Sequence, residues 1–100
     1  MNILKINSGK VEMRKDSGVL IRIIGNGNAV NADISNDGSL ILVTTVKGVV
    51  ELRKEGGSLI RNIGNGDATN ARFSGNDIVV STNKGKIELR KENGSIIRII

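Results

Sequence analysis

The sequence predicts an all-β fold of short antiparallel strands, arranged as successive copies of one repeat. Three observations lead to this prediction. Apolar and polar residues alternate, turns rich in glycine and asparagine interrupt the chain at short intervals, and one residue pattern occurs three times. Alternation with a period of two places side chains on opposite faces of a strand, whereas a helix needs a period of about 3.6.

The repeat is clearest in a charged strand that follows a glycine. It occurs at residues 9–15 (GKVEMRK), 48–54 (GVVELRK) and 85–91 (GKIELRK). The interval is 39 residues from Gly9 to Gly48 and 37 residues from Gly48 to Gly85. The two missing residues fall in one turn, where residues 36–39 (NDGS) correspond to the shorter 75–76 (GN). Self-similarity of this length is typical of repeat architectures.

Each repeat divides into strands at its turns. Val50 and Leu52 point to one face, and Glu51 and Arg53 to the other. Glycine, asparagine and aspartate accept the positive φ that tight hairpin turns require. The first repeat has three predicted strands, at residues 2–7, 10–15 and 19–24, and lacks the first strand of the others. The predicted strands of the later repeats are 29–35, 40–46, 49–54 and 58–63, then 68–74, 78–83, 86–91 and 95–100.

Four short strands joined by hairpins resemble one blade of a β-propeller. Residues 77–89 resemble the middle of a quinoprotein (pyrroloquinoline-quinone type) repeat, and residues 29–40 resemble the start of a WD40 repeat. The Trp-Asp that closes the third WD40 strand is Arg-Lys in all three repeats here, and the tryptophan of quinoprotein blades is absent. The resemblance therefore implies the architecture, and it carries over no cofactor and no binding residue.

The chain is predicted to be one domain of three repeats. Residues 1–27 form a three-stranded partial blade, and residues 28–66 and 67–100 form full blades. Propellers close with about four to eight blades, so three blades would leave two flat aliphatic faces exposed. We expect a homo-oligomer that closes the ring head to tail. A homodimer of six blades is the first expectation, and a trimer of nine is the second.

Composition disfavours an enzyme. The 100 residues contain no His, Cys, Tyr or Trp, and one Phe. No carboxylates are paired in a recognisable catalytic or metal-binding arrangement, so we expect no catalytic residue, metal or cofactor. No apolar run approaches the roughly 20 residues of a membrane span. Without an apolar signal sequence, a cytoplasmic protein is expected.

Six polar residues are candidate contacts for a ligand or partner. Those on the first strand of each full repeat would line a central channel, where opposite charges would pair or would bind a small polar molecule. Those in the glycine-rich links between repeats would shape a turn or contact a ligand at one rim. The six residues are Asn31, Asn70, Asp33 and Arg72 on the strands, and Asn26 and Asn65 in the links.

Charged residues also recur with the repeat. Glu12, Glu51 and Glu88 stand beside Arg14, Arg53 and Arg90. They form either a ring of carboxylates or, as we favour, ion pairs across strands on an exposed outer face, joined by Arg22, Arg61 and Arg98. The turns between second and third strands carry Lys10, Lys47, Lys84 and Lys86, which would gather at one rim and favour an anionic partner.

The function predicted from the sequence is a non-catalytic interaction or scaffold module that presents loops on a symmetric ring. A module that binds a carbohydrate or a small anion is the first alternative. Weak binding of nucleic acid through the lysine turns is the second. The formal net charge of +5 favours it, but the near absence of aromatic rings for stacking bases disfavours it.

Overall fold

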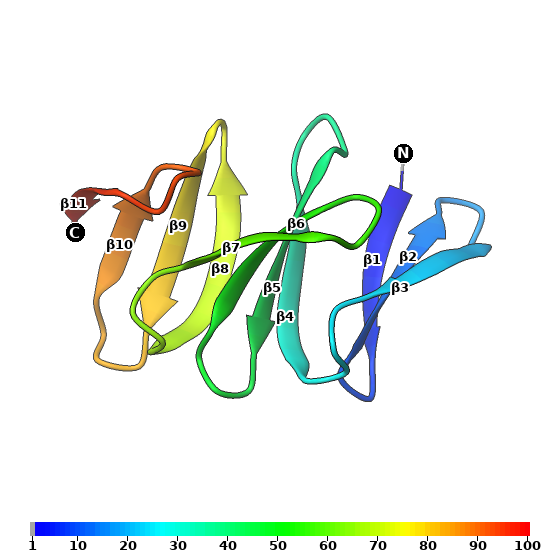
Figure 1. The fold of residues 1–100 in the computed structure, drawn as a ribbon, viewed down its shortest axis with the longest axis horizontal. Coiled ribbons are helices and arrows are strands. Elements are labelled where there is room, and N and C mark those ends of the chain that lie inside the picture. Colours follow the sequence, from blue (N-terminus) through cyan, green and yellow to red (C-terminus); the bar gives the residue numbers. More distant parts are fainter. Residues whose placement is uncertain (1) are drawn as a thin grey trace.

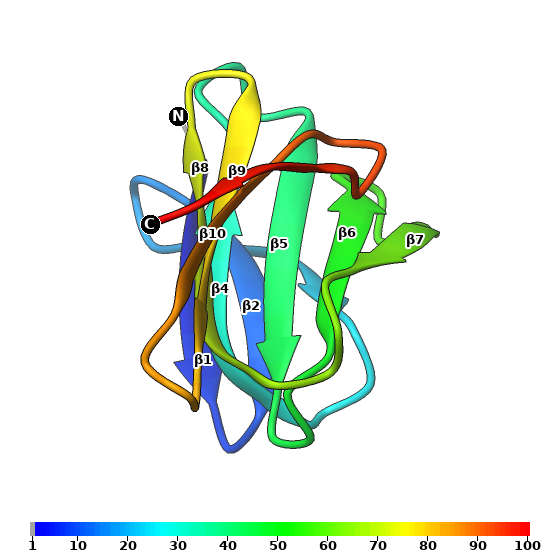
Figure 2. The ribbon, with the colours of Figure 1, turned by 90° about the vertical axis from the view of Figure 1, so that its left-hand side faces the viewer.

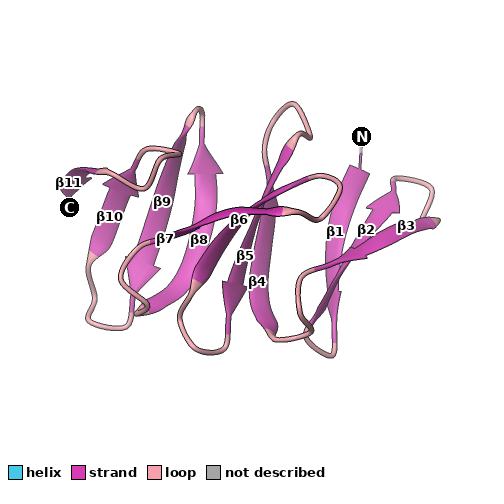
Figure 3. Ribbon diagram, viewed as in Figure 1, coloured by secondary structure: helices cyan, strands magenta, loops and turns pink. Residues whose placement is uncertain are grey.

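The computed structural model describes residues 2–100, and these residues form only strands and turns (Figure 3). Three antiparallel sheets, here named blades 1 to 3, follow one another along the chain. Blade 1 contains β1 (Asn2–Asn7), β2 (Lys10–Lys15) and β3 (Leu20–Ile24). Blade 2 contains β4 (Ala29–Ile34), β5 (Leu40–Thr45), β6 (Val50–Lys54) and β7 (Leu59–Ile63). Blade 3 contains β8 (Ala68–Ser74), β9 (Asp77–Thr82), β10 (Ile87–Arg90) and β11 (Ile96–Ile99). The predicted all-β class is confirmed.

The blades stand in an open row (Figure 1). The row gives the chain a long axis of 38 Å, against 26 Å and 19 Å across it. Figure 2 looks along the row, with blade 3 nearest the viewer. Blades 1 and 3 each keep one face without a neighbouring sheet in the part of the chain described.

The register shows which strands correspond. Leu4 of β1 pairs with Met13, and Leu42 of β5 pairs with Leu52. In blade 3 the same place is taken by Val79 of β9, opposite Leu89. Strand β1 is therefore the equivalent of β5 and β9. Blade 1 lacks the strand that β4 and β8 supply in the other blades.

The core lies between the blades. We call the face of a blade that points to the next blade its front face, and the opposite face its back face. One buried cluster joins the front of blade 1 to the back of blade 2. It contains Val11, Met13, Ile24, Ala29, Ile41 and Val43. A second cluster joins blades 2 and 3. It contains Leu42, Val50, Leu52, Ile63, Ala68, Ala71, Ile78 and Val80. Each large aliphatic side chain buried here contributes about 1.5–3 kcal/mol to stability.

Main-chain hydrogen bonds also tie one blade to the next. The amide of Ala29 donates to the carbonyl oxygen of Gly9 at 2.9 Å, and the amide of Ala68 donates to that of Gly48 at 3.0 Å. Both glycines have positive φ, and a Cβ on Gly48 would lie 2.5 Å from the carbonyl oxygen of Gly66. Only glycine allows the turn and the link to approach this closely.

Candidate interaction surfaces

The four candidate channel residues lie on β4 and β8. Asn31 and Asn70 are half-buried, and Arg72 is exposed. Asp33 uses its carboxylate within the chain, because Oδ2 accepts a hydrogen bond from the amide of Phe73 at 2.8 Å and Oδ1 accepts one from the amide of Ile34 at 2.9 Å. The structure therefore gives Asp33 a contact between blades, and no ion pair joins it to Arg72 among residues 2–100.

Asn26 and Asn65 are exposed in the links between blades. Each stands between two glycines of positive φ: Asn26 between Gly25 and Gly27, and Asn65 between Gly64 and Gly66. The first link packs tightly against the β1–β2 turn, since a Cβ on Gly9 would clash with the carbonyl oxygen of Gly27. The positive φ accounts for the four link glycines, and the two asparagine side chains are open to solvent.

The recurring Glu and Arg residues do not lie on an exposed face, and that prediction was wrong. Glu51, Arg53, Glu88 and Arg90 are buried. The pairing also runs along one strand rather than across strands. Arg53 Nε donates to Glu51 at 2.9 Å, and Arg90 Nε donates to Glu88 at 2.9 Å. Alternation places both charges on the back face, which the preceding blade covers.

Each of these arginines also binds a turn. Nη1 of Arg14, Arg53 and Arg90 donates to a glycine carbonyl oxygen four residues later, at 2.7 Å in each blade. The guanidinium thus joins the third strand of its blade to the turn that follows. The sequence predicted the pairing of Glu with Arg but not the bond to the turn, although its signal was present as a Gly four residues after each Arg.

Blade 1 contains the equivalent pair, Glu12 and Arg14, but its arginine is more exposed to solvent. The Arg14 side chain is 29% exposed, against 10% for Arg53 and 8% for Arg90. The hydrogen bond from Arg14 holds the pKa of Glu12 below its usual range, and the nearby charge of Lys5 acts in the same direction. The pair is therefore built on the back of blade 1 even though no blade covers it in this chain.

The front face of blade 3 exposes positions that are core in the other blades. Ile87 is 40% exposed, whereas Val11 and Val50 at the same position are 0% exposed. Ile100 is 74% exposed, whereas Ile24 and Ile63 are 1% exposed. This face therefore has the apolar surface that blades 1 and 2 use to bind the next blade.

The back face of blade 1 is open in the same way but carries more charge. Ile3 is 47% exposed, while its equivalents Ile41 and Ile78 are fully buried. Lys5 stands opposite Glu12, where blades 2 and 3 have Val43 and Val80. The prediction of two flat aliphatic end faces was thus correct for blade 3 and incomplete for blade 1, whose face combines Ile3 with charged side chains.

Lysines gather at one end of the sheets. Lys10, Lys47, Lys84 and Lys86 lie at the turns β1–β2, β5–β6 and β9–β10, and all four are exposed. These turns lie along one edge of the row, the lower edge in Figure 1. We call this edge the lysine rim.

Comparison with known proteins supports the architecture. The sequence matches no known family profile and no curated protein. Among solved structures, the chain is similar to BamB from Moraxella catarrhalis, a β-propeller protein, with a TM-score of 0.77 and 17% identity. The match covers 99% of this chain and 32% of that one, so the chain spans about a third of that protein's length. The fold is propeller-like, and no helix among residues 2–100 could cross a membrane.

Proposed function

We propose that the chain completes a closed β-propeller by binding further copies of itself head to tail, and that the ring acts as a non-catalytic interaction module. One observation carries the proposal. The front of blade 3 and the β1–β3 part of the back of blade 1 correspond to the two sides of an interface that the chain already forms twice within itself, and both are open.

The geometry of the repeat supports a heterologous contact. A copy placed against Ile87 and Ile100 would present Ile3, as blade 2 presents Ile41 to blade 1. Such a contact joins two different surfaces, and repeating it gives a ring when the rotation from blade to blade adds up to a full turn. Two chains supply six blades, within the usual range of about four to eight, and three chains supply nine. The homodimer is therefore the favoured assembly and the trimer the second.

Two charge-bearing substitutions test the contact. Ile87→Glu places a carboxylate on the front of blade 3, and Ile3→Glu places one on the back of blade 1. Each variant alone is expected to lose assembly. Val50→Glu is the matched control, because Val50 is already fully buried within one chain and a buried, unpaired carboxylate there should unfold it.

Mixing the two assembly variants makes the test specific. The Ile3→Glu chain keeps an intact front, and the Ile87→Glu chain keeps an intact back. One intact junction then forms in the mixture and none forms in either variant alone. If Ile3→Glu by itself assembles as well as the unmodified chain, the head-to-tail arrangement is wrong.

The lysine rim supports a second candidate function, the binding of an anionic partner such as nucleic acid. A ring would multiply the four lysines at one edge. Affinity for duplex DNA would then fall steeply with salt, and each Lys→Ala substitution would lower the log–log slope by about 1. Binding that is insensitive to salt would remove this candidate. The cytoplasmic location expected from the sequence stays a prediction.

A further inference from the structure

A pocket of about 250 Å³ opens between blades 2 and 3, at the edge opposite the lysine rim. The turn β4–β5 forms one wall, and the turns β8–β9 and β10–β11 form the others. The residues that line it are Ser35, Asn36, Asp37, Ser39, Leu40, Phe73, Gly75, Asn76 and Glu92. All belong to one chain, so the pocket exists whether or not the chain assembles.

The pocket arises from the unequal lengths of two turns. Blade 2 joins β4 to β5 through residues 35–39, whereas blade 3 joins β8 to β9 through Gly75 and Asn76 alone. The shorter turn leaves the Phe73 side chain half-buried. This is the one aromatic ring in the sequence, and it forms the apolar floor of the pocket together with Leu40.

The serine hydroxyl groups in the pocket wall already donate hydrogen bonds within the chain. The hydroxyl groups of Ser35 and Ser39 donate to Asp37 Oδ1 at 2.8 Å and 2.7 Å, and the Ser39 amide donates to the same oxygen at 2.9 Å. These bonds, with those from Ser39 foremost, lower the pKa of Asp37 to about 2. Asp37 is therefore a carboxylate at neutral pH, and neither serine has a hydrogen left to donate to a ligand.

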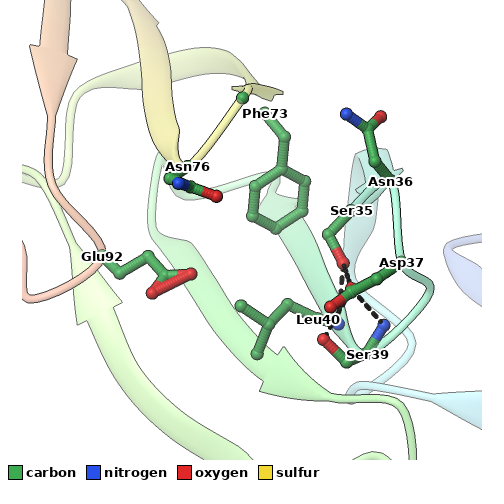
Figure 4. A pocket seen from close by; sticks show the side chains of 9 residues that line it. Ser35, Asn36, Asp37, Ser39, Leu40, Phe73, Asn76 and Glu92 are labelled. Carbon is green, nitrogen blue, oxygen red and sulfur yellow. Dashed lines mark hydrogen bonds between the residues drawn. The ribbon is translucent and has the colours of Figure 1, made fainter.

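A second carboxylate faces the first across the floor. Figure 4 shows Glu92 reaching in from one side and Asp37 on the other, with Leu40 and the Phe73 ring between them. No hydrogen bond or ion pair to the Glu92 carboxylate is formed among residues 2–100. Carboxylates only accept hydrogen bonds when ionised, so the pocket offers acceptors at both ends and an apolar surface in the middle.

We propose that this pocket binds an organic cation, an ammonium or guanidinium group on an aliphatic stem. The stem would lie on Leu40 and Phe73, as the long side chains of lysine and arginine lie on apolar surfaces. The cation would donate charge-assisted hydrogen bonds to the Glu92 carboxylate and would be attracted by the face of the Phe73 ring. An anion would be repelled by both carboxylates. A neutral sugar would find the carboxamides of Asn36 and Asn76 as the only side-chain donors in the lining.

Titration calorimetry with agmatine as the probe tests this site. Replacing Glu92 with Gln is expected to weaken binding about two- to five-fold, because an ion pair with an exposed carboxylate is screened by solvent. Phe73→Leu is expected to weaken it about two- to five-fold, through the lost cation–π contact. Glu55→Gln is the matched control. It removes the equivalent carboxylate of blade 2, which does not line this pocket, and is expected to leave affinity unchanged.

Further titrations distinguish a cation carried by a polypeptide from a free amine, and they can also contradict the proposal. A short peptide with a single arginine that binds at least ten-fold more tightly than agmatine would indicate a polypeptide partner, and equal affinities would indicate a free amine. Three results would overturn the proposal. They are no heat of binding at millimolar agmatine, undiminished binding by Glu92→Gln, or binding of methyl glucoside in preference to agmatine.

Discussion

Asp33 of blade 2 accepts a hydrogen bond from the main-chain amide of Phe73 in blade 3, at 2.8 Å and 40 residues away in sequence. The same carboxylate also accepts a hydrogen bond from the main-chain amide of Ile34 in its own strand. One side chain thus satisfies main-chain donors in two blades, and it fixes the position of Phe73, which forms part of the floor of the pocket between blades 2 and 3.

Replacing Asp33 with Ala should therefore weaken the junction between blades 2 and 3. It leaves the half-buried amide of Phe73 without its acceptor, which costs about 1–3 kcal/mol. Chemical denaturation measures the loss. Arg72 occupies the equivalent position in blade 3 but is exposed, so Arg72→Ala should change stability by no more than about 0.5 kcal/mol. Equal losses in the two variants would contradict this role of Asp33.

The buried Glu–Arg pairs give a second comparison. Arg53→Ala leaves Glu51 buried without its partner and should lower the free energy of unfolding by about 3–5 kcal/mol. Arg14→Ala should cost clearly less in the unassembled chain, because the Arg14 side chain is more exposed. In the assembled ring, a neighbouring blade would cover Arg14, and the two losses should become similar. The check is thermal denaturation above and below the concentration at which the chain assembles.

Two equivalent glycines, one at an inter-blade contact and one at the open end of the row, give a matched pair. Gly48 and Gly85 have φ of 83° and 78°, so alanine is strained at both by about 1–2 kcal/mol. Only at Gly48 would the new Cβ meet a neighbouring main chain, at 2.5 Å from Gly66, whereas nothing lies within 4 Å at Gly85. Gly48→Ala is thus expected to be the more destabilising by denaturation. A larger loss for Gly85→Ala would show that the close contact at Gly48 is unimportant.

The lowered pKa of Asp37 predicts that the folded chain loses part of its stability at acid pH. Its pKa is about 2 in the folded chain and roughly 3.9 when unfolded. A depressed folded pKa contributes stability that is present above the unfolded value and is lost as pH falls from about 4 toward 2. Asp37→Asn cannot titrate, so its melting temperature should fall less across that window than that of the unmodified chain. Identical pH profiles would contradict the hydrogen bonding described for the turn.

The sequence predicted the strands well because their determinants are local. The alternation of apolar and polar residues, together with the glycines in the turns, predicted the bounds of each strand to within one residue of those observed. It did not predict that the polar side of a strand is also covered. Glu51 and Arg53 alternate with Val50 and Leu52 as they would on a solvent-exposed sheet, and burial of the second face depends on the next blade.

The pocket was missed for a similar reason, since it depends on two turns from different repeats. Its signal was nevertheless in the sequence. The repeat loses two residues at the turn that follows Phe73, the only aromatic residue. The turn is shortened next to the one aromatic ring, and this marks the place where blade 3 differs from blade 2 and the pocket forms.

The native mass of the purified chain, measured by light scattering across a range of concentrations, tests the central proposal most directly. Ring closure predicts a discrete species of two chains of 10.6 kDa each, or of three as the second expectation. The same species should be lost in Ile87→Glu and restored in part when that variant is mixed with Ile3→Glu. A folded, single-chain species at every concentration would contradict closure by self-assembly.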